Sequence, residues 1–323
     1  MPPSDRLMDS VLDFSIIICA YTLDRWDELV ASVASAQRQT LPARDVVLVV
    51  DYNEELLRRA AAACPGVIVL SNDGVLGLGD ARNTGAAAAQ GAVLAFLDDD
   101  AIAADDWLEQ LLPGYADPAV LGVGGFIEPV WPAGPPRWFP SEFNWVVGCT
   151  YTGAPEGIAA VRNLIGTNMS VRAEVLEAAG GFDANLGRHD RPAKAEETEF
   201  CIRASRLYPS GSWLYRPAAK VLHVVSPQRT TWRFFTGRCR GEGASKAHLV
   251  RLTGSQSGLA SERRYVVSTL PSGVAREMGA ALRGHFDGAG RAGAIIVGFW
   301  LTAVSYLRGR LTRAPSEQGI SPR

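Results

Sequence analysis

The sequence predicts an α/β protein whose first hundred residues form a doubly wound, mainly parallel sheet. Short apolar runs alternate with stretches of helical periodicity, which is typical of βαβ units with right-handed crossovers. Because the runs are apolar without polar alternation, we expect strands that are buried on both faces. At 323 residues the chain is long enough for such a domain and an appendage. The apolar runs cover residues 14–20, 46–50, 67–70 and 93–97.

The segments between these runs carry helix signals in the expected order. After the first run, Asp24 is placed to cap a helix that Pro42 ends. A second helix is expected over residues 54–64, where Pro65 stops it. Before the fourth run, the Gly-rich stretch 74–85 opens an Ala-rich helix.

The fourth run leads directly into Asp98, Asp99 and Asp100. Ligands of open α/β sheets bind just beyond the carboxyl ends of such strands. Three adjacent carboxylates repel one another unless they are solvated, cap a helix or face a cation. Capping of a helix over residues 105–112 and binding of a cation are therefore both open interpretations of this triplet.

Beyond residue 120 the pattern loosens. Residues 131–140 form an aromatic, proline-rich loop that is long enough to be functional. The polar, basic segment 187–195 is expected to be mobile and to lead into a helix that begins near Glu196. The remaining expected elements are a strand region at 160–171, a helix at 173–179 and a short strand at 221–225.

Composition and charge narrow the classes of function. With 47% hydrophobic and 20% charged residues, the chain is an ordinary globular protein rather than a disordered one. Residues 1–226 hold 17 Lys and Arg against 29 Asp and Glu, whereas residues 227–323 hold 15 against 5. We therefore expect the basic C-terminal region to meet a membrane surface or phosphate groups, and we expect no nucleic-acid partner.

The cysteines and the N-terminus indicate a cytoplasmic protein. Five cysteines are scattered without metal-ligand spacing, and Cys19 and Cys201 lie inside apolar patterns that predict core positions. The N-terminal residues include acidic ones and form no apolar signal-peptide core, so synthesis in a reducing compartment is expected.

One C-terminal segment is a candidate for membrane association. Residues 292–307 carry no charge and are flanked by arginines. As a helix they extend about 24 Å, short of a bilayer core of about 30 Å. A span, an in-plane anchor and a buried helix all remain open. The expected division is a catalytic domain at 1–228 and a helical, basic region at 229–323.

Taken in order, several motifs resemble those of a family 2 glycosyltransferase with the GT-A fold. The resemblance covers about residues 14–245, and it implies a GT-A (Rossmann-like) mixed sheet flanked by helices, with the basic helical region as an extension. The matching pieces are Cys19-Ala20-Tyr21, Asp51, the loop 77–85, the Asp triplet and Glu196-Glu197.

The resemblance implies a donor site for a nucleotide diphosphate sugar. It places Ala20, Tyr21 and Asp51 at the nucleotide. It places Asp99 at the ribose, with Asp98 assisting. Arg82 would then meet the diphosphate, although a surface salt bridge is its alternative interpretation.

The same resemblance implies a metal site that holds Mn²⁺ or Mg²⁺. Asp100 would bind the cation, since carboxylates are the ligands that hard divalent cations prefer. His223 is the second implied ligand, and Arg229 follows it as in relatives. A core histidine that binds no metal is the alternative for His223. The cation would neutralise the diphosphate as it departs.

The acceptor side is implied by three further motifs. Inverting transfer needs a base for the acceptor hydroxyl, and the family places an acidic pair at the start of a helix. We assign the base to Glu197 and keep Glu196 as the alternative. Thr167 and Asn168 would line the acceptor site. Arg238 and Arg240 resemble a motif of lipid-linked members, with a solvated helix face as the other interpretation.

The predicted function is therefore that of an inverting, metal-dependent glycosyltransferase of cell-envelope or glycan biosynthesis. It would use a nucleotide sugar, UDP-linked by preference, and a glycan or polyprenyl-phosphate-linked acceptor. The enzyme would lie at the cytoplasmic face of the membrane as a peripheral or monotopic protein. A GT-A nucleotidyltransferase and a non-catalytic sugar- or lipid-binding module are the alternatives. A dehydrogenase is disfavoured because no G-x-G-x-x-G follows the first strand.

Overall fold

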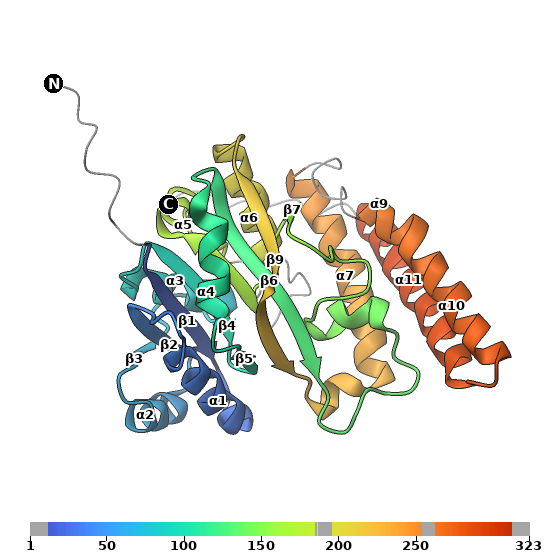
Figure 1. The fold of residues 1–323 in the computed structure, drawn as a ribbon, viewed down its shortest axis with the longest axis horizontal. Helices are drawn as coiled ribbons and strands as arrows, with labels where there is room; N and C mark the ends of the chain where they lie inside the picture. The colour runs from blue at the N-terminus through green and yellow to red at the C-terminus, as the bar shows by residue number, and fades with distance from the viewer. Residues whose placement is uncertain (1–11, 185, 187–195, 254–261, 312–323) are drawn as a thin grey trace, which may run out of the picture.

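A computed structural model describes residues 12–184, 186, 196–253 and 262–311. In these residues, nine strands form one mixed sheet in the order β3-β2-β1-β4-β8-β6-β9-β5, and β7 pairs with β9 (Figure 1). The strands are β1 (Phe14–Ala20), β2 (Asp45–Val50), β3 (Ile68–Ser71), β4 (Val93–Asp98), β5 (Ala101–Ala103), β6 (Val120–Val130), β7 (Ala159–Val161), β8 (Asn168–Arg172) and β9 (Ser212–Val224).

Helices cover the sheet and extend beyond it. The α-helices are α1 (Trp26–Gln37), α2 (Glu54–Ala63), α3 (Leu78–Ala88), α4 (Trp107–Leu111), α5 (Ala173–Ala178), α6 (Glu196–Leu207), α7 (Trp232–Thr253), α9 (Glu262–Arg264), α10 (Leu270–Leu282) and α11 (Asp287–Leu311). Short helical turns are η1 (Leu23–Arg25), η2 (Leu112–Ala116), η3 (Ser141–Val147), η4 (Pro227–Thr230) and η5 (Tyr265–Thr269).

The first four strands confirm the predicted βαβ arrangement. β1 pairs in parallel with β2 and β4, and β3 pairs in parallel with β2. Ile16 and Ile18 face one apolar core, and Ile17 faces the other, so this part of the sheet is buried on both faces. At Gly85, a side chain would collide with Ile17 and Val49, which explains how closely α3 packs on the sheet.

The second half of the sheet differs from the sequence prediction. The short strand expected at 221–225 is the end of the long strand β9, and the strand region expected at 160–171 is divided into β7 and β8. β6 gave little strand signal because it contains Gly122, Gly124 and Gly125. These glycines are needed because the backbones approach closely: a Cβ at Gly125 would overlap the carbonyl of Ala219.

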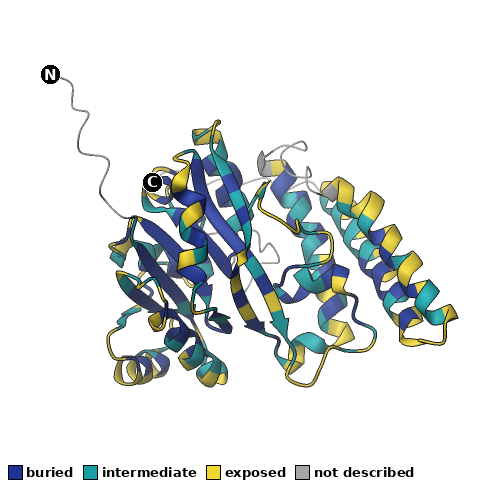
Figure 2. Ribbon diagram, in the orientation of Figure 1, coloured by how far each residue is buried: buried dark blue, intermediate teal, exposed yellow. Residues whose placement is uncertain are grey.

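The C-terminal helices pack onto the body of the protein. Phe143 of η3, Phe235 of α7 and Ile295 of α11 share one apolar cluster with Ile127 of β6. Figure 2 shows α10 and α11 with buried residues on one side and exposed residues on the other. Among the described helices, α11 is long and apolar enough to cross a membrane by length and composition.

Candidate active site

The strand β5 brings His223 to the Asp triplet. β4 ends at Asp98, and after a two-residue turn Ala101 begins β5 and pairs with His223 of β9. The amide of Val224 donates to the carbonyl of Asp100 at 2.9 Å. The triplet therefore lies where the carboxyl ends of β4 and β9 meet.

Asp98, Asp100 and His223 form a cluster with metal-binding chemistry. One ligand atom from each lies within 4.8 Å of the others. His223 Nε2 is 3.0 Å from Asp100 Oδ1, and both side chains are buried. Two carboxylates and an imidazole suit a divalent cation such as Mn²⁺. The family resemblance implied Asp100 and His223 as metal ligands, and in the structure Asp98 lies in the same cluster with them.

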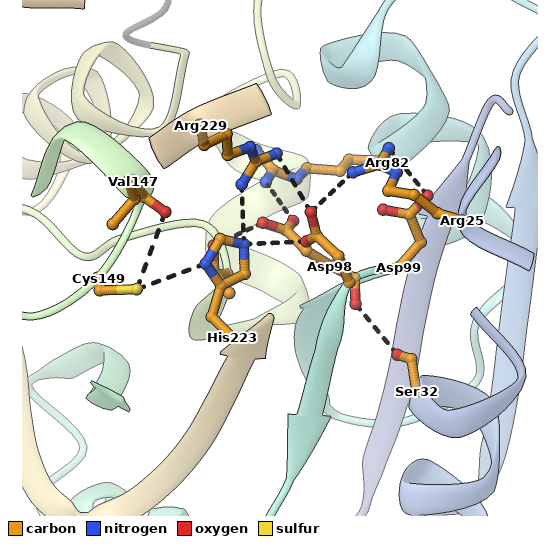
Figure 3. A network of polar contacts seen from close by, with 11 residues as sticks. Arg25, Ser32, Arg82, Asp98, Asp99, Val147, Cys149, His223 and Arg229 are labelled. Atoms are coloured by element: carbon orange, nitrogen blue, oxygen red, sulfur yellow. Dashed lines mark hydrogen bonds and ion pairs between the residues drawn. The ribbon is translucent and has the colours of Figure 1, made fainter. Parts of the chain in front are cut away.

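Arg25 and Arg229 contact two members of the triplet, Asp99 and Asp100 (Figure 3). Arg25 contacts Asp100 Oδ2 at 2.8 Å and Asp99 Oδ2 at 3.1 Å. Arg229 contacts Asp100 Oδ2 at 3.1 Å and His223 Nε2 at 3.2 Å. Burial alone would raise the pKa of Asp100, but the hydrogen bond with His223 and the two guanidinium charges hold it below its ordinary value.

Asp99 is the least satisfied member of the triplet. Burial raises the pKa of its carboxyl to about 8, against the opposing charge of Arg25. Although Arg25 lies nearby, Asp99 Oδ2 has no hydrogen-bond partner among the described residues. A buried polar atom without a partner costs free energy, so this oxygen fits a position that a donor hydroxyl or a cation completes.

Arg82 lies buried between carboxylates instead of on the surface. Its guanidinium is 3.6 Å from both Asp98 Oδ1 and Glu196 Oε1. It stacks over Phe182 and rests on Gly166, where a Cβ would overlap the guanidinium. Within the described chain, Arg82 Nη1 and Glu196 Oε2 lack hydrogen-bond partners, so this group also has capacity for a ligand.

Glu197 has the protonation properties of a general base. Burial and the neighbouring charge of Glu196 raise the pKa of Glu197 to about 7, and Arg82 partly opposes this. Glu196 is the more buried of the two and faces Arg82. A carboxylate that titrates near neutral pH is suited to proton abstraction. The preceding segment, 187–195, lies outside the described residues.

The predicted nucleotide residues lie at the ends of β1 and β2. Tyr21 is exposed and stacks on the guanidinium of Arg25 at 4.9 Å. Asp51 is buried and accepts hydrogen bonds from Asn72 Nδ2 at 2.7 Å and Gly77 N at 3.0 Å. Asp51 thus fixes the start of the Gly-rich loop before α3, and Ala20 lies buried beside it in β1.

The predicted acceptor residues are not all brought together. Thr167 Oγ1 donates to Asp98 Oδ2 at 2.5 Å and so belongs to the cluster. Asn168 is 1% exposed, and its amide is engaged by Trp107, Phe126 and Ala219. Its amide therefore acts in the core. Arg238 is half-buried and Arg240 exposed on α7.

Two further residues at the site, Arg25 and Cys149, were not predicted from the sequence. One feature of the sequence could have indicated Arg25: it is a cation shortly after the first strand, and ligands of open α/β sheets bind beyond the carboxyl ends of the strands. Cys149 had no sequence signal at all. Its Sγ lies 3.4 Å from His223 Nδ1 and 3.8 Å from the carbonyl of Val147. Burial raises the pKa of the Cys149 thiol to about 12, so it is neutral beside the imidazole.

Comparison with known sequences gives a family and two curated relatives. The family model described as Glycosyl transferase family 2 matches residues 15–180. A glucosyl-dolichyl phosphate glucuronosyltransferase of Haloferax volcanii is 35% identical over 239 residues, which are 72% of this chain and 75% of the relative. Glycosyltransferase AglE of the same organism is 32% identical over 187 residues, 55% of this chain and 59% of AglE.

Comparison with solved structures supports the fold. The mannosyltransferase PcManGT of Pyrobaculum calidifontis, in complex with GDP-Man and Mn²⁺, aligns with a TM-score of 0.58 at 18% identity, over 95% of this chain and 89% of that one. GalNAc-T7 with UDP, GalNAc and Mn²⁺ aligns with a TM-score of 0.52 at 18% identity. That alignment covers 80% of this chain and about half, 55%, of GalNAc-T7.

Proposed function

This chain belongs to glycosyltransferase family 2 and has the GT-A fold, and on that premise we propose that it transfers a sugar from a nucleotide diphosphate sugar to a lipid-linked acceptor with inversion. The observation that carries the proposal is that a cluster with metal-binding chemistry lies opposite an acidic pair that could supply a base. Asp98 and Asp100 form a cation cluster with His223. Through Arg82, the same Asp98 faces the pair Glu196-Glu197.

The donor would lie over the carboxyl ends of β1, β2 and β4. Asp51 and Tyr21 would hold the base, and Asp99, with its unpartnered oxygen, would bind a ribose hydroxyl. Asp98, Asp100 and His223 would hold Mn²⁺ or Mg²⁺, which when bound neutralises the departing diphosphate. Both solved relatives contain Mn²⁺ with a nucleotide, which agrees with this donor set.

The arginines would act on the same leaving group. Arg25 and Arg229 both contact Asp100 directly. Since a guanidinium binds phosphate oxygens as well as carboxylates, either arginine can turn from Asp100 to the diphosphate when a cation takes over the carboxylate charge. Arg82 is deeper and would set the positions of Asp98 and Glu196.

Glu197 would remove the proton of the acceptor hydroxyl as that oxygen attacks the anomeric carbon. Its pKa of about 7 leaves a large share of the carboxylate charged at neutral pH. Glu196 remains the alternative, but its contact with Arg82 favours a positioning role. Thr167 donates a hydrogen bond to Asp98, and we propose that it lines the acceptor site.

The acceptor class rests on the relative and on the C-terminal region. The Haloferax enzyme is named for a glucosyl-dolichyl phosphate acceptor. We propose that residues 229–323 face the acceptor and the membrane. In this region 15 Lys and Arg stand against 5 Asp and Glu. Arg238 and Arg240 lie on α7 within this region and would meet the lipid phosphate.

A transfer assay with matched variants tests the proposal. UDP- and GDP-sugars are supplied with Mn²⁺ or Mg²⁺ and with prenyl phosphate, glucosyl prenyl phosphate or a soluble glycan as acceptor. We expect metal-dependent transfer to a lipid acceptor, lost in Asp100→Asn and retained in Asp105→Asn, whose side chain is 68% exposed. Transfer to the soluble glycan alone would refute the lipid acceptor, and metal-free transfer by Asp100→Asn would refute the donor site.

A further inference from the structure

The helices α10 and α11 form a hairpin, and two large apolar side chains are strongly exposed at the turn between them. Leu282 is 86% exposed and Phe286 is 81% exposed. In Figure 1 this turn lies at the lower right, at the far end of the hairpin formed by α10 and α11. Large apolar side chains at an exposed turn cost solubility, so their presence indicates a surface that meets an apolar phase.

The exposed side of α11 continues from this turn as a single apolar stripe. Ile296, Trp300, Val304 and Leu307 are all at least 38% exposed. At 3.6 residues per turn, these four positions lie within about 40° of Trp300 around the helix axis, and Phe286 directly precedes the first residue of the helix. Ala289 and Gly293 fall on the same line between them. The stripe is therefore continuous along the helix.

Cations border the stripe and the turn. Arg308 and Arg310 project about 80° to either side of Trp300 around the helix axis. From there their long side chains can reach polar surroundings while the stripe is buried in an apolar phase. At the turn, an open hollow of about 680 Å³ is lined by Arg137, His285 and Arg291, together with Phe286 and Asp287. Arg137 forms no ion pair with any described residue.

The hollow is held in shape by contacts with the protein body. Arg291 Nε donates to Glu277 Oε2 at 2.6 Å, and its Nη1 donates to the carbonyl of Arg137 at 3.2 Å. Trp138, next to Arg137, packs edge-on against Trp232 and Phe235 of α7. The loop after β6 and the hairpin therefore present their cations together.

The opposite face of α11 excludes a simple span. Gly298 packs against Phe143 and Phe235, where a Cβ would overlap the Phe143 ring. Ser305 Oγ donates to the carbonyl of Arg240 on α7 at 2.7 Å. If α11 crossed a bilayer, α7 with Arg240 and Glu242 would enter the hydrocarbon beside it, which is costly for charged side chains.

We propose that α11 lies flat on an anionic bilayer through this stripe, that Leu282 and Phe286 insert at the turn, and that the hollow takes the phosphate of a lipid headgroup. The stripe supplies the apolar area of an interfacial helix, and the arginines supply the attraction to anionic lipid. This proposal rests on the proposed function, which places the acceptor in a membrane. Membrane binding itself can be measured without sugar transfer.

Co-sedimentation of the full chain with vesicles tests the stripe. We expect binding to phosphatidylcholine vesicles that contain phosphatidylglycerol, and at least about tenfold weaker partition for the double variant Trp300→Glu/Leu307→Glu. Leu207→Glu is the matched control, because Leu207 is 54% exposed at the end of α6, and it should bind as the wild type does. Equal partition of the stripe variant and the wild type, or no binding by the wild type, would overturn the proposal.

A second variant tests the hollow. Arg137→Glu should weaken the preference for phosphatidylglycerol and keep the weaker partition into pure phosphatidylcholine. If inorganic phosphate without vesicles stabilises the wild type but not Arg137→Glu, and vesicle binding is the same for both, the hollow binds a free anion and the headgroup assignment is wrong. A wild-type dimer that the stripe variant converts to a monomer would make the stripe a subunit interface, which contradicts the membrane assignment.

These outcomes separate the two proposals. Vesicle binding without transfer to any lipid acceptor would leave the docking surface intact and refute the proposed acceptor. Transfer to a lipid acceptor in detergent, without vesicle binding, would do the reverse.

Discussion

Two networks of arginines around buried carboxylates lie in this molecule, and they are built differently. The hairpin network consists of Glu142, Arg276, Glu277 and Arg291, and it joins η3 to α10 and α11 through contacts of 2.6–2.9 Å. The sheet-edge network consists of the Asp triplet, Glu196, His223 and the arginines 25, 82 and 229. There, Arg82 stands 3.6 Å from both of its carboxylates.

The difference concerns how completely each network is satisfied. Among the described residues of the hairpin network, Glu142 Oε2 is the atom that lacks a hydrogen-bond partner. The sheet-edge network leaves three such atoms, on Arg82, Asp99 and Glu196. Closely paired charges hold elements together, whereas incompletely paired charges keep capacity for a ligand. The first network should therefore control stability, and the second should control chemistry.

The largest expected effect is on transfer and comes from Glu197→Gln. Replacing the base with an amide should lower kcat by about 10³-fold, because proton abstraction is lost while shape is kept. Donor affinity should stay close to the wild-type value. The measurement is a single-turnover transfer rate with a parallel binding titration, and Glu199→Gln on the same helix is the control. Wild-type kcat in Glu197→Gln, with loss in Glu196→Gln, would move the base to Glu196.

The second effect is on stability and comes from Arg276→Ala in the hairpin network. It leaves Glu142, which is fully buried, without its partner, and should lower the free energy of unfolding by about 3 kcal/mol. Urea unfolding measures this change. The double variant Arg276→Ala/Glu142→Gln should recover part of the loss, since it removes the unpaired charge. A loss of transfer with unchanged stability would break the division between the networks.

A third, smaller effect is expected at Cys149. For His223 Nε2 to face a cation, Nδ1 must carry the proton, and the Cys149 sulfur is its acceptor. Cys149→Ala should weaken Mn²⁺ binding about tenfold, as measured by titration calorimetry. Cys239→Ala, which empties an equally buried site on α7, controls for the cavity. Equal weakening in both variants would reduce Cys149 to a packing role.

The smallest effect is a pH trend set by Glu197. Its pKa is about 7 in the folded protein against an ordinary value of 4.5, so the folded state binds the proton more tightly. The bound proton therefore contributes to the free energy of unfolding at low pH, and this contribution is lost as pH rises through 7. In EDTA, the Tm of Glu197→Gln should therefore rise relative to that of the wild type between pH 5 and pH 8. In a separate assay with Mn²⁺, wild-type kcat should rise over the same interval. A constant Tm difference would show that the pKa of Glu197 is not raised.

The sequence predicted one half of the sheet better than the other. In β1 to β4, each apolar run is local and continuous, so strand and burial follow from the residues themselves. β6 is assembled by close backbone contact at three glycines, which carry no pattern. The long β9 is defined by its pairing with β6 and β5, which only the folded chain supplies.

The same distinction applies to the site. The Asp triplet and the Glu pair are contiguous in the sequence and follow a strand or open a helix, so their positions could be predicted. Arg25 and Cys149 become neighbours of Asp100 and His223 only through the crossing of distant segments. Asn168 shows the converse, because its position was predicted but its amide is engaged in the core.

A thermal-shift panel of nucleotide diphosphates, with and without Mn²⁺, tests most directly whether the sheet-edge network is the donor and metal site. At 100 times its dissociation constant, one nucleotide should stabilise the wild type by about 2.7 kcal/mol in a metal-dependent manner. The shift should vanish in Asp100→Ala and persist in Arg276→Ala, despite the lower starting stability of the latter. No shift with any nucleotide, or an undiminished shift in Asp100→Ala, would contradict a donor and metal site at the sheet-edge network.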